Sequence, residues 1–559
     1  MSNETAPGSL RNALLLISGV FVGALATAGL ALLVVELRDD GRGVGALAAP
    51  NFVEEAGAAG VDHVYDGEFQ YFVGGGVAAF DCNDDGRSDL FFAGGSRPAG
   101  LFRNESPVGG ELRFSALHDP VTDMTGVTGA YPLDVDSDGL TDLAVLRVGE
   151  NSMLRGLGDC RFEPANELWG VDGGMEWTAS FSATWEGEEE LPTLAFGNYL
   201  ALTEEGERGE GCADHSLFRP QGDRYGDEIG LSPGWCTLSI LFSDWSRTGQ
   251  RDLRMTNDRH YYTDGEEQLW KVVEDEVPSL YGRDDGWAKT KIWGMGIASH
   301  DLDGDGLPEV FLTSQGDNKL QTLSADTDGP SYEDIALSSG ATAHRPFVGD
   351  TTMPSTAWHA EFDDVNNDGF MDLFVTKGNV DAMPEFAMND PNNLLLGQPD
   401  GTFVEGAEDA GLADLARSRG GVVVDLNLDG LLDVVVVDRR ENVKVWRNLG
   451  HGGTGGTEPM GNWLAVDVEQ PGPNRDAIGS WIEVRFDSTT IRREVTVGGG
   501  HAGGELGWIH FGLGEATEVE VRVLWPDGDA GPWLTVETNQ FAILARDTTA
   551  PAPWTPPSD

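Results

Sequence analysis

Short apolar runs alternate with acidic turns along most of this chain. Val77–Phe80 precedes a turn rich in aspartate and glycine, and Leu90–Phe92 follows it. The same order appears near the end of the series, where Val422–Val424 and Val434–Val437 enclose another such turn. Short runs rich in β-branched and aromatic side chains, joined by Asp, Asn and Gly, predict strands rather than helices. We therefore expect β-hairpins whose connecting loops are acidic.

The acidic turns recur at regular intervals. Their first positions are 81, 134, 185, 244, 301, 364 and 425, which makes seven units. A regular period of this length is typical of repeat proteins, and one unit is long enough for a four-stranded blade. Seven blades can close a ring that leaves no open sheet edge. We therefore predict an all-β chain in which residues 51–451 form a seven-bladed β-propeller.

The loop from Asp301 to Glu309 shows the chemistry most clearly. It carries carboxylates at loop positions 1, 3, 5 and 9 and a glycine at position 6, which allows a sharp turn. Several oxygens arranged in this way suit Ca²⁺, whereas an EF-hand would need a Glu at position 12 and flanking helices. We predict about five structural Ca²⁺ sites, with these ligands: Asp81, Asn83, Asp85 and Asp89; Asp134, Asp136, Asp138 and Asp142; Asp301, Asp303, Asp305 and Glu309; Asp364, Asn366, Asp368 and Asp372; Asp425, Asn427, Asp429 and Asp433.

Two units depart from the pattern. The unit at 244 keeps its glycine and its outer aspartates, but Ser246 and Thr248 replace charged ligands. The unit at 185 keeps only the apolar runs on either side of the turn. Whether these third and fourth units bind metal stays open.

The N-terminus contains the longest apolar run. Ala13–Val35 is 23 residues without a charge, and a helix of that length spans roughly 34 Å, enough to cross a bilayer. We expect a short tail over 1–12, a transmembrane signal-anchor helix over 13–36 and a linker over 37–50. Cleavage near Ala26-Thr27-Ala28 is the alternative, and it would make the protein secreted.

The four cysteines, Cys82, Cys160, Cys212 and Cys236, form no C-x-x-C motif. In an exported chain an even number suggests disulfides, and one candidate pairing is Cys82 with Cys160 and Cys212 with Cys236. A buried thiol is the alternative for Cys82. We expect a cell-envelope protein, anchored by a single pass, whose C-terminal part lies outside the cytoplasm.

The net charge of −58 exceeds what the loops require. Five divalent ions would return only ten charges, so the remaining surface must be acidic too. Such a field makes nucleic acid and anionic lipid headgroups poor partners. Solubility is the simplest explanation of this charge.

Downstream of the repeats the chain changes character. Short apolar runs separated by Gly, Pro and Asp predict a small β-sandwich or barrel over 462–546, joined by a hinge at 452–461. The proline-rich tail over 547–559 is expected to be disordered.

Two segments match the residue pattern of a catalytic or cofactor-binding motif but lack a feature that the motif needs. Gly230-Leu231-Ser232-Pro233-Gly234 resembles a nucleophile elbow, but Pro233 lacks the backbone N–H that would serve as oxyanion donor. Gly498-Gly499-Gly500-His501-Ala502-Gly503 resembles a dinucleotide fingerprint, but a strand follows it instead of a helix. His300 and His359 are expected to be packed structural histidines. The sequence predicts no catalytic residues.

Several motifs resemble a known family. Gly74–Phe80 running into the first loop, then Leu101-Phe102-Arg103-Asn104, resembles the FG-GAP/VCBS repeat proteins related to cartilage acidic protein. Asn474–Gly479, His510–Gly514 and Trp525–Gly528 resemble the ASPIC/UnbV domain that follows such propellers. The resemblance implies an integrin-α-like propeller with calcium in its blade loops and an extracellular, non-catalytic role in adhesion or recognition.

Two hypotheses follow. The first is a membrane-anchored calcium-binding propeller for adhesion, recognition or envelope assembly, whose partner is a protein or polysaccharide. The second is a polysaccharide hydrolase or lyase with its site in the central channel of the propeller.

Overall fold

The computed structural model describes most of the chain. The described residues are 46, 48–187, 189–203, 208–258, 265–324, 329–342, 354–380, 386–387, 390–451 and 460–557. The expected anchor over 13–36 lies outside them, as do most of the 37–50 linker and most of the 452–461 hinge. Within the described ranges, no helix has the length and apolar character needed to cross a membrane.

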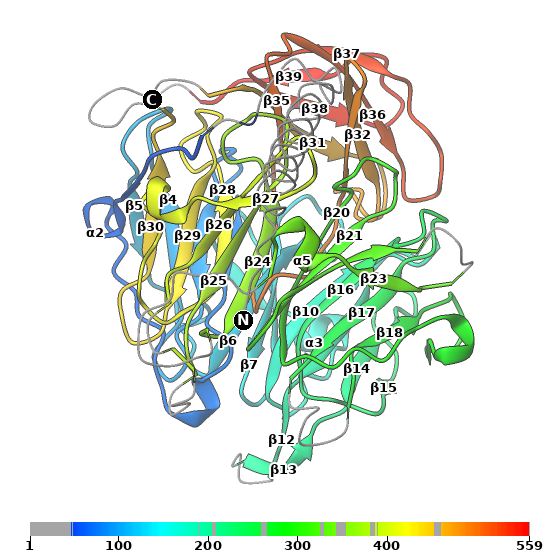
Figure 1. The fold of residues 1–559 in the computed structure, drawn as a ribbon. Helices are drawn as coiled ribbons and strands as arrows, with labels where there is room; N and C mark the ends of the chain where they lie inside the picture. The colour runs from blue at the N-terminus through cyan, green and yellow to red at the C-terminus, as the bar shows by residue number, and fades with distance from the viewer. Residues whose placement is uncertain are drawn as a thin grey trace, which may run out of the picture. The chain divides into compact units, whose positions relative to one another are not determined.

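Each of the first six repeats contributes four antiparallel strands to one sheet, and the sheets follow one another along the chain (Figure 1). In strand order the first six are β2 (Val77–Phe80), β3 (Asp89–Phe92), β4 (Gly100–Asn104) and β5 (Phe114–Leu117); β6 (Val127–Leu133), β7 (Asp142–Arg147), β8 (Ser152–Gly156) and β9 (Phe162–Pro164); β10 (Thr178–Thr184), β11 (Thr193–Asn198), β14 (His215–Phe218) and β15 (Ile229–Leu231); β16 (Thr237–Ser243), β17 (Asp252–Asn257), β18 (Gln268–Lys271) and β19 (Ser279–Leu280); β20 (Gly294–His300), β21 (Glu309–Ser314), β22 (Lys319–Leu323) and β23 (Tyr332–Asp334); β24 (Ala357–Asp363), β25 (Asp372–Lys377), β26 (Asn393–Gly397) and β27 (Phe403–Glu405).

The last sheet of the series combines both ends of the repeat region. It consists of β28 (Ser418–Val424), β29 (Asp433–Asp438) and β30 (Lys444–Asn448), with β1 (Phe52–Glu54) as its outer strand. Phe52 pairs with Asn448 in an antiparallel register. An N-terminal strand thus completes a sheet built from the end of the repeats, an arrangement that ties the two ends of a propeller together. The protein is all-β and propeller-like.

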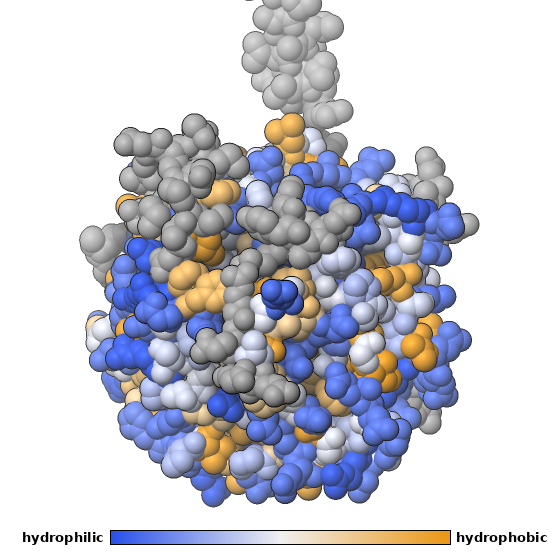
Figure 2. Space-filling view, turned by 90° about the horizontal axis from the view of Figure 1, so that it is seen from below, coloured by the Kyte–Doolittle hydropathy of each residue, from blue (hydrophilic) through white to orange (hydrophobic). Residues whose placement is uncertain are grey.

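The helices are short and accompany the sheets. They are α2 (Ala56–Ala59), α3 (Asn166–Trp169), α5 (Ala336–Ser339) and α6 (Ala407–Ala410), with 3₁₀ turns η1 (Phe69–Tyr71) and η2 (Arg283–Asp285). A further hairpin is formed by β12 (Leu200–Leu202) and β13 (Arg208–Cys212). On the face shown in Figure 2, hydrophilic side chains predominate and hydrophobic ones form small separate patches, as the acidic composition leads one to expect.

Both candidate disulfides are present. Cys82 pairs with Cys160, and Cys212 pairs with Cys236. The first joins the loop between β2 and β3 to the turn between β8 and β9, so it links two consecutive sheets of the series. Cys82 is therefore half of a disulfide and not a free buried thiol.

The C-terminal region is a β-sandwich. One sheet has the order β35 (Ile509–Gly514), β31 (Asn462–Glu469), β38 (Gln540–Ala545) and β39 (Ala552–Trp554); the other has β33 (Thr489–Glu494), β32 (Trp481–Phe486), β36 (Glu518–Leu524) and β37 (Leu534–Glu537). Leu464 and Val466 from the first sheet and Val484 and Val521 from the second belong to one buried cluster. Alternating apolar residues on each strand face that common core.

The segment after β33 leaves the sandwich and enters the centre of the repeat sheets. Isolated bridges join Val497 to Ala183, Gly498 to Leu241, Gly500 to Ile297 and Gly503 to Ala130, and β34 (Glu505–Leu506) pairs with β2. These partners lie on the first strands of five different sheets. We call residues 495–506 the plug. The glycine pattern that resembles a nucleotide fingerprint thus lies at the centre of the repeat sheets, where a Cβ added to Gly500 would lie 2.8 Å from the His359 ring.

The expected disorder of the 547–559 tail is wrong over the described part. β39 pairs with β38, and the Trp554 ring lies 5.0 Å from Trp508 and 5.4 Å from Phe541 between centroids. Burial of the large Trp554 ring against this aromatic cluster offsets the entropy that the tail loses on becoming ordered. A high proline content gives no indication of such a contact.

Candidate metal centres

The five intact loops share one hydrogen-bonding scheme. The position-1 carboxylate accepts from the N–H of the position-6 glycine, as when Gly139 donates to Asp134 Oδ2 at 2.9 Å. The position-9 carboxylate accepts from the N–H at position 2, as when Val135 donates to Asp142 Oδ2 at 2.8 Å. Each position-6 glycine has a left-handed φ, from +80° at Gly86 to +96° at Gly306, which explains why glycine is needed there. The sequence therefore closes each loop around its own carboxylates.

The second loop concentrates three carboxylates. Asp134, Asp136 and Asp142 each offer an oxygen within 4.8 Å of the other two. Burial and, to a smaller extent, the nearby charge of Asp476 raise the pKa of Asp134 to about 7. Burial also raises the pKa of Asp142 to about 8, with Asp136 and Asp134 contributing. Arg155 partly offsets this charge, since its Nε donates to Asp136 Oδ2 at 2.6 Å.

The fifth loop forms a similar cluster. Asp301, Asp303 and Glu309 offer oxygens within 4.8 Å of one another, although Asp303 and Asp305 are exposed. Burial raises the pKa of Glu309 to about 7, and the charges of Asp303 and Asp301 add to the effect. A cation between these groups would favour their charged forms and so oppose both the effect of burial and the mutual repulsion that raise this pKa.

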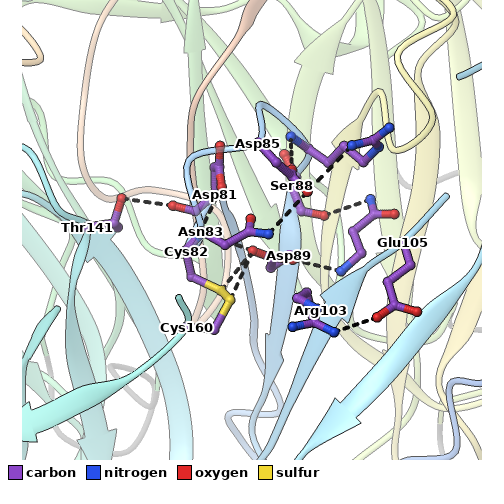
Figure 3. The surroundings of a disulfide bond; sticks show 12 residues. Asp81, Cys82, Asn83, Asp85, Ser88, Asp89, Arg103, Glu105, Thr141 and Cys160 are labelled. Carbon is purple, nitrogen blue, oxygen red and sulfur yellow. Dashed lines mark hydrogen bonds and ion pairs between the residues drawn. A yellow bond between two sulfur atoms is a disulfide. The ribbon is translucent and has the colours of Figure 1, made fainter. Parts of the chain in front are cut away.

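The first loop lies beside the disulfide (Figure 3). Asp89 Oδ2 accepts from the Cys82 N–H at 2.9 Å, and Asp89 Oδ1 accepts from the Asn104 N–H at 2.7 Å. Burial raises the pKa of Asp89 to about 8, and Asp81 and Asp85 also raise it. Cys82, Asp89 and Cys160 lie close together, but both sulfurs are bonded to each other, so neither is a thiolate ligand.

The sixth and seventh loops are the most deeply buried. Burial raises the pKa of Asp364 well above its usual value, and the charge of Asp368 adds to this. The pKa of Asp425 rises to about 8 through burial and the charge of Asp429. At position 9, the pKa values of Asp372 and Asp433 are also raised, first by burial and then by the charges of the carboxylates at positions 1 and 5 of the same loop. The structure thus brings three carboxylates together in the second loop and three in the fifth, and in the sixth and seventh loops burial raises the pKa values of the aspartates at positions 1 and 9.

These loops fit a hard cation. Four buried side-chain oxygens at positions 1 or 3 have no hydrogen-bond partner: Asn83 Oδ1, Asp136 Oδ1, Asp301 Oδ1 and Asn427 Oδ1. These oxygens can only accept, and leaving them unpaired in the interior is costly. A Ca²⁺ ion takes six to eight oxygens and would satisfy them. The donor set and the unpaired oxygens therefore both suit Ca²⁺.

The two eroded units reach a different arrangement. In the unit at 244, Asp244 still accepts from the N–H groups of Thr248 and Gly249, but Trp245 Nε1 donates to Asp252 Oδ2 at 2.8 Å. In the unit at 185, Glu186 forms a two-pronged ion pair with Arg219 at 2.8 Å. In both units, side-chain donors hold the acidic groups.

Sequence reasoning missed one acidic group. Glu361, Asp363 and Glu505 offer oxygens within 4.8 Å of one another, and Arg493 pairs with Asp363. Glu505 belongs to the plug, so no spacing along the chain could place it beside β24. The missed arginines Arg155 and Arg492 likewise reach their loops only through tertiary packing.

Comparison with known proteins agrees with this architecture. The family described as FG-GAP-like repeat matches residues 81–181, 301–375 and 364–436, and the family described as ASPIC and UnbV matches 470–551. No curated protein matches the chain.

Several solved structures are similar. They include BBS1N in complex with ARL6DN (TM-score 0.40, 10% identity, covering 71% of this chain and 96% of that chain). An Agrocybe aegerita lectin that recognises non-reducing terminal N-acetylglucosamine has a TM-score of 0.36 at 15% identity, covering 66% and 93%. The Dos1 propeller has a TM-score of 0.34 at 11% identity, covering 74% and 97%.

The FG-GAP-like matches fall on the repeats with acidic loops, and the ASPIC and UnbV match falls on the β-sandwich that follows them. The chain is an FG-GAP-repeat protein with a C-terminal ASPIC and UnbV domain.

Proposed function

We propose that this protein is a calcium-binding, seven-bladed β-propeller that acts outside the cytoplasm as a non-catalytic adhesion, recognition or envelope-assembly protein. The observation that carries the proposal is the set of buried loop oxygens without hydrogen-bond partners, which lie among carboxylates whose pKa values are raised by burial. The predicted anchor over 13–36 would hold the protein at the membrane, and cleavage there would release it.

The blade number is supported by contacts between sheets. The first strands meet in the cyclic order β2, β6, β10, β16, β20, β24 and β28, and β28 contacts β2 again. Each of these strands begins one of the four-stranded sheets described above. A cycle of seven such neighbours is what a closed ring of seven blades requires.

The location is supported by the two disulfides. Cys82–Cys160 and Cys212–Cys236 use all four cysteines of the chain. Disulfides persist in oxidising compartments and are rare in the cytosol. Free Ca²⁺ at the millimolar level outside the cell would suffice for sites of roughly 0.1 to 1 mM affinity.

In support of a non-catalytic role, the plug meets the first strands of five sheets and takes up part of the space that a channel enzyme would use. Beside the plug a cavity of about 180 Å³ remains, and its lining includes His359, Glu361 and Arg493. The partner we propose is a protein or a polysaccharide that contacts the outer surface.

Calcium titration of the purified full-length protein tests the proposal. We expect isothermal titration calorimetry to detect about five sites, in line with the five intact loops, and 2 mM Ca²⁺ to raise the melting temperature. A chelated sample that melts at the same temperature, together with no binding heat, would rule out structural Ca²⁺ sites in these loops.

A further inference from the structure

The C-terminal domain lies directly on the acidic loops. Four of the five intact loops are hydrogen-bonded to it. Trp508 Nε1 donates to Gly86 O (3.2 Å), Asn474 N–H to Ser137 Oγ (3.0 Å), Arg492 Nη1 to Gly304 O (3.0 Å), and Gly514 N–H to Asn367 O (2.8 Å). In the remaining loop, a Cβ added to Gly430 would lie 1.9 Å from the Trp463 ring. The face that carries the candidate Ca²⁺ sites is thus also the docking face for the domain.

In the fifth loop, at 301–309, the Asp301 carboxylate both contacts the C-terminal domain and faces the candidate cation site. The Asp301 side chain is 0% exposed, and its Oδ2 accepts from Arg492 Nη1 at 2.9 Å and from the Gly306 N–H at 3.1 Å. Its other oxygen, Oδ1, is buried and has no hydrogen-bond partner. One oxygen is therefore held by the C-terminal domain while the other remains available to a cation.

In the sixth loop the docking residue lies between ligand positions. Asn367, with a left-handed φ of +59°, accepts from His510 Nε2 through Oδ1 at 2.6 Å. Its neighbours Asp364 and Asp368 are predicted ligands, and Asp364 Oδ1 accepts from the Asp368 N–H at 3.1 Å. An ion that fixes these carboxylates also fixes the turn that presents Asn367 to the domain.

The eroded unit at 244 docks without ligand carboxylates at positions 3 and 5. Arg247 lies 4.1 Å from the centroid of the Trp481 ring and 3.3 Å from Glu483. Arg251 donates to the carbonyls of Gly479 at 2.9 Å and Pro526 at 2.8 Å. Here two cationic side chains of the propeller itself, Arg247 and Arg251, lie near the buried Asp244.

We propose that cation binding in the acidic loops and docking of the C-terminal domain are thermodynamically coupled. Bound ions hold the loops in the shape that the domain recognises, and the docked domain, by burying the loops, strengthens cation binding. This coupling rests on the proposed Ca²⁺ function and adds its regulation: depletion of Ca²⁺ loosens the domain and withdraws the plug. Because coupling is reciprocal, the same factor acts in both directions.

Hydrogen exchange of the plug tests the proposal on the full-length protein. The amides of Gly499 and Gly500 donate to Ile240 O (2.8 Å) and Ile297 O (2.7 Å), so they report docking directly. We expect chelation of Ca²⁺ to speed exchange in peptides covering 495–506 by at least tenfold, while the amides of β17, which follows the eroded loop at 244, change less. An equal rise in β17 would mean general unfolding and would overturn the coupling.

Calorimetry on the same samples distinguishes failure of the coupling from failure of the proposed Ca²⁺ binding. Unchanged plug exchange despite measured Ca²⁺ binding would overturn the coupling and leave the proposed function intact. Absence of any binding heat would overturn both.

Variants test the reverse direction. His510→Ala removes the donor to Asn367 and is expected to weaken Ca²⁺ binding about threefold or more, whereas His510→Gln retains an N–H donor and should restore it. Arg485→Gln is the matched control, because Arg485 lies on the same domain but pairs with Glu520 at 2.8 Å, away from the loops. Equal Ca²⁺ affinity in His510→Ala and the control would contradict the coupling.

Discussion

The backbone N–H of His501 donates a hydrogen bond to Nδ1 of His359 at 3.2 Å, although 142 residues separate them. His501 is fully buried, and its ring lies 5.0 Å from that of Trp358. Its Nε2 accepts from the Gly74 N–H at 3.3 Å, and its Nδ1 contacts Met295 O at 3.1 Å. The tip of the plug is thus bonded to several parts of the propeller.

His501→Ala should destabilise the protein by about 3 kcal/mol, because it leaves two buried backbone groups without partners and opens a cavity. Urea unfolding followed by tryptophan fluorescence measures the change. His118→Ala is the control, since the His118 side chain is 80% exposed. If both variants unfold at the same urea concentration, the plug tip contributes nothing to stability.

Asp136→Asn should weaken Ca²⁺ binding at the second loop about tenfold, or ~1.4 kcal/mol, because a neutral amide replaces a ligand carboxylate. The fold should persist, since Asp134 still accepts the Gly139 N–H. Calorimetry with Ca²⁺ would then count one site fewer at low calcium. Ser246→Ala in the eroded unit should leave the titration unchanged, and an equal effect there would argue against loop binding.

The calcium-free protein should lose stability as the pH rises from 7 to 8.5. Asp89 and Asp142 have folded-state pKa values of about 8, above the ordinary value of 3.8, so the folded protein holds protons that the unfolded chain has lost. Raising the pH through 8 removes those protons and the stability they confer. Buried histidines such as His501, with a pKa lowered to about 3, are already neutral in this range.

Saturating Ca²⁺ should abolish that pH dependence, because the ion replaces the protons among the loop carboxylates. Melting curves at pH 7.0, 7.75 and 8.5, with and without Ca²⁺, check both statements. A calcium-free melting temperature that rises over this range would contradict the electrostatic account of the loops.

Loss of the Cys82–Cys160 disulfide should cost more stability than loss of Cys212–Cys236. The pairs close segments with sequence separations of 78 and 24. The chain-entropy model then predicts a difference of about 1 kcal/mol. Denaturant unfolding of the two double Cys→Ser variants measures it, and the opposite order would show that local packing outweighs loop length.

Phe52→Ala should weaken closure of the propeller ring by about 3 kcal/mol. Phe52 is 5% exposed in β1 and packs in the cluster that includes Trp446. Early release of β1 would show as fast hydrogen exchange in β30, the strand with which β1 pairs. Val53→Ala is the control, because Val53 is 39% exposed on the same strand; equal exchange in both variants would argue against closure through β1.

Local sequence accounts for the hairpins and their loops. The apolar runs on either side of Asp81 and Asp425 become buried strands, because β-branched and aromatic residues fit a pleated, covered surface. Glycine at position 6 fixes each turn, since the left-handed backbone there excludes most other residues. The predicted ligands of each loop therefore lie on one turn, because they fall within nine residues of one another.

Contacts between distant segments were decided only by the tertiary structure. Nothing near Gly498 or Glu505 in the chain indicates that the plug enters the propeller, because its partners lie on β2, β6, β10, β16 and β20. The proline-rich tail is ordered because Trp554 finds Phe541 and Trp508. Period and composition determined which residues form sheets and loops, since those depend on neighbours in sequence. The docking of the C-terminal domain onto the acidic loops depends instead on the complementary shape and charge of surfaces that exist only after both parts have folded.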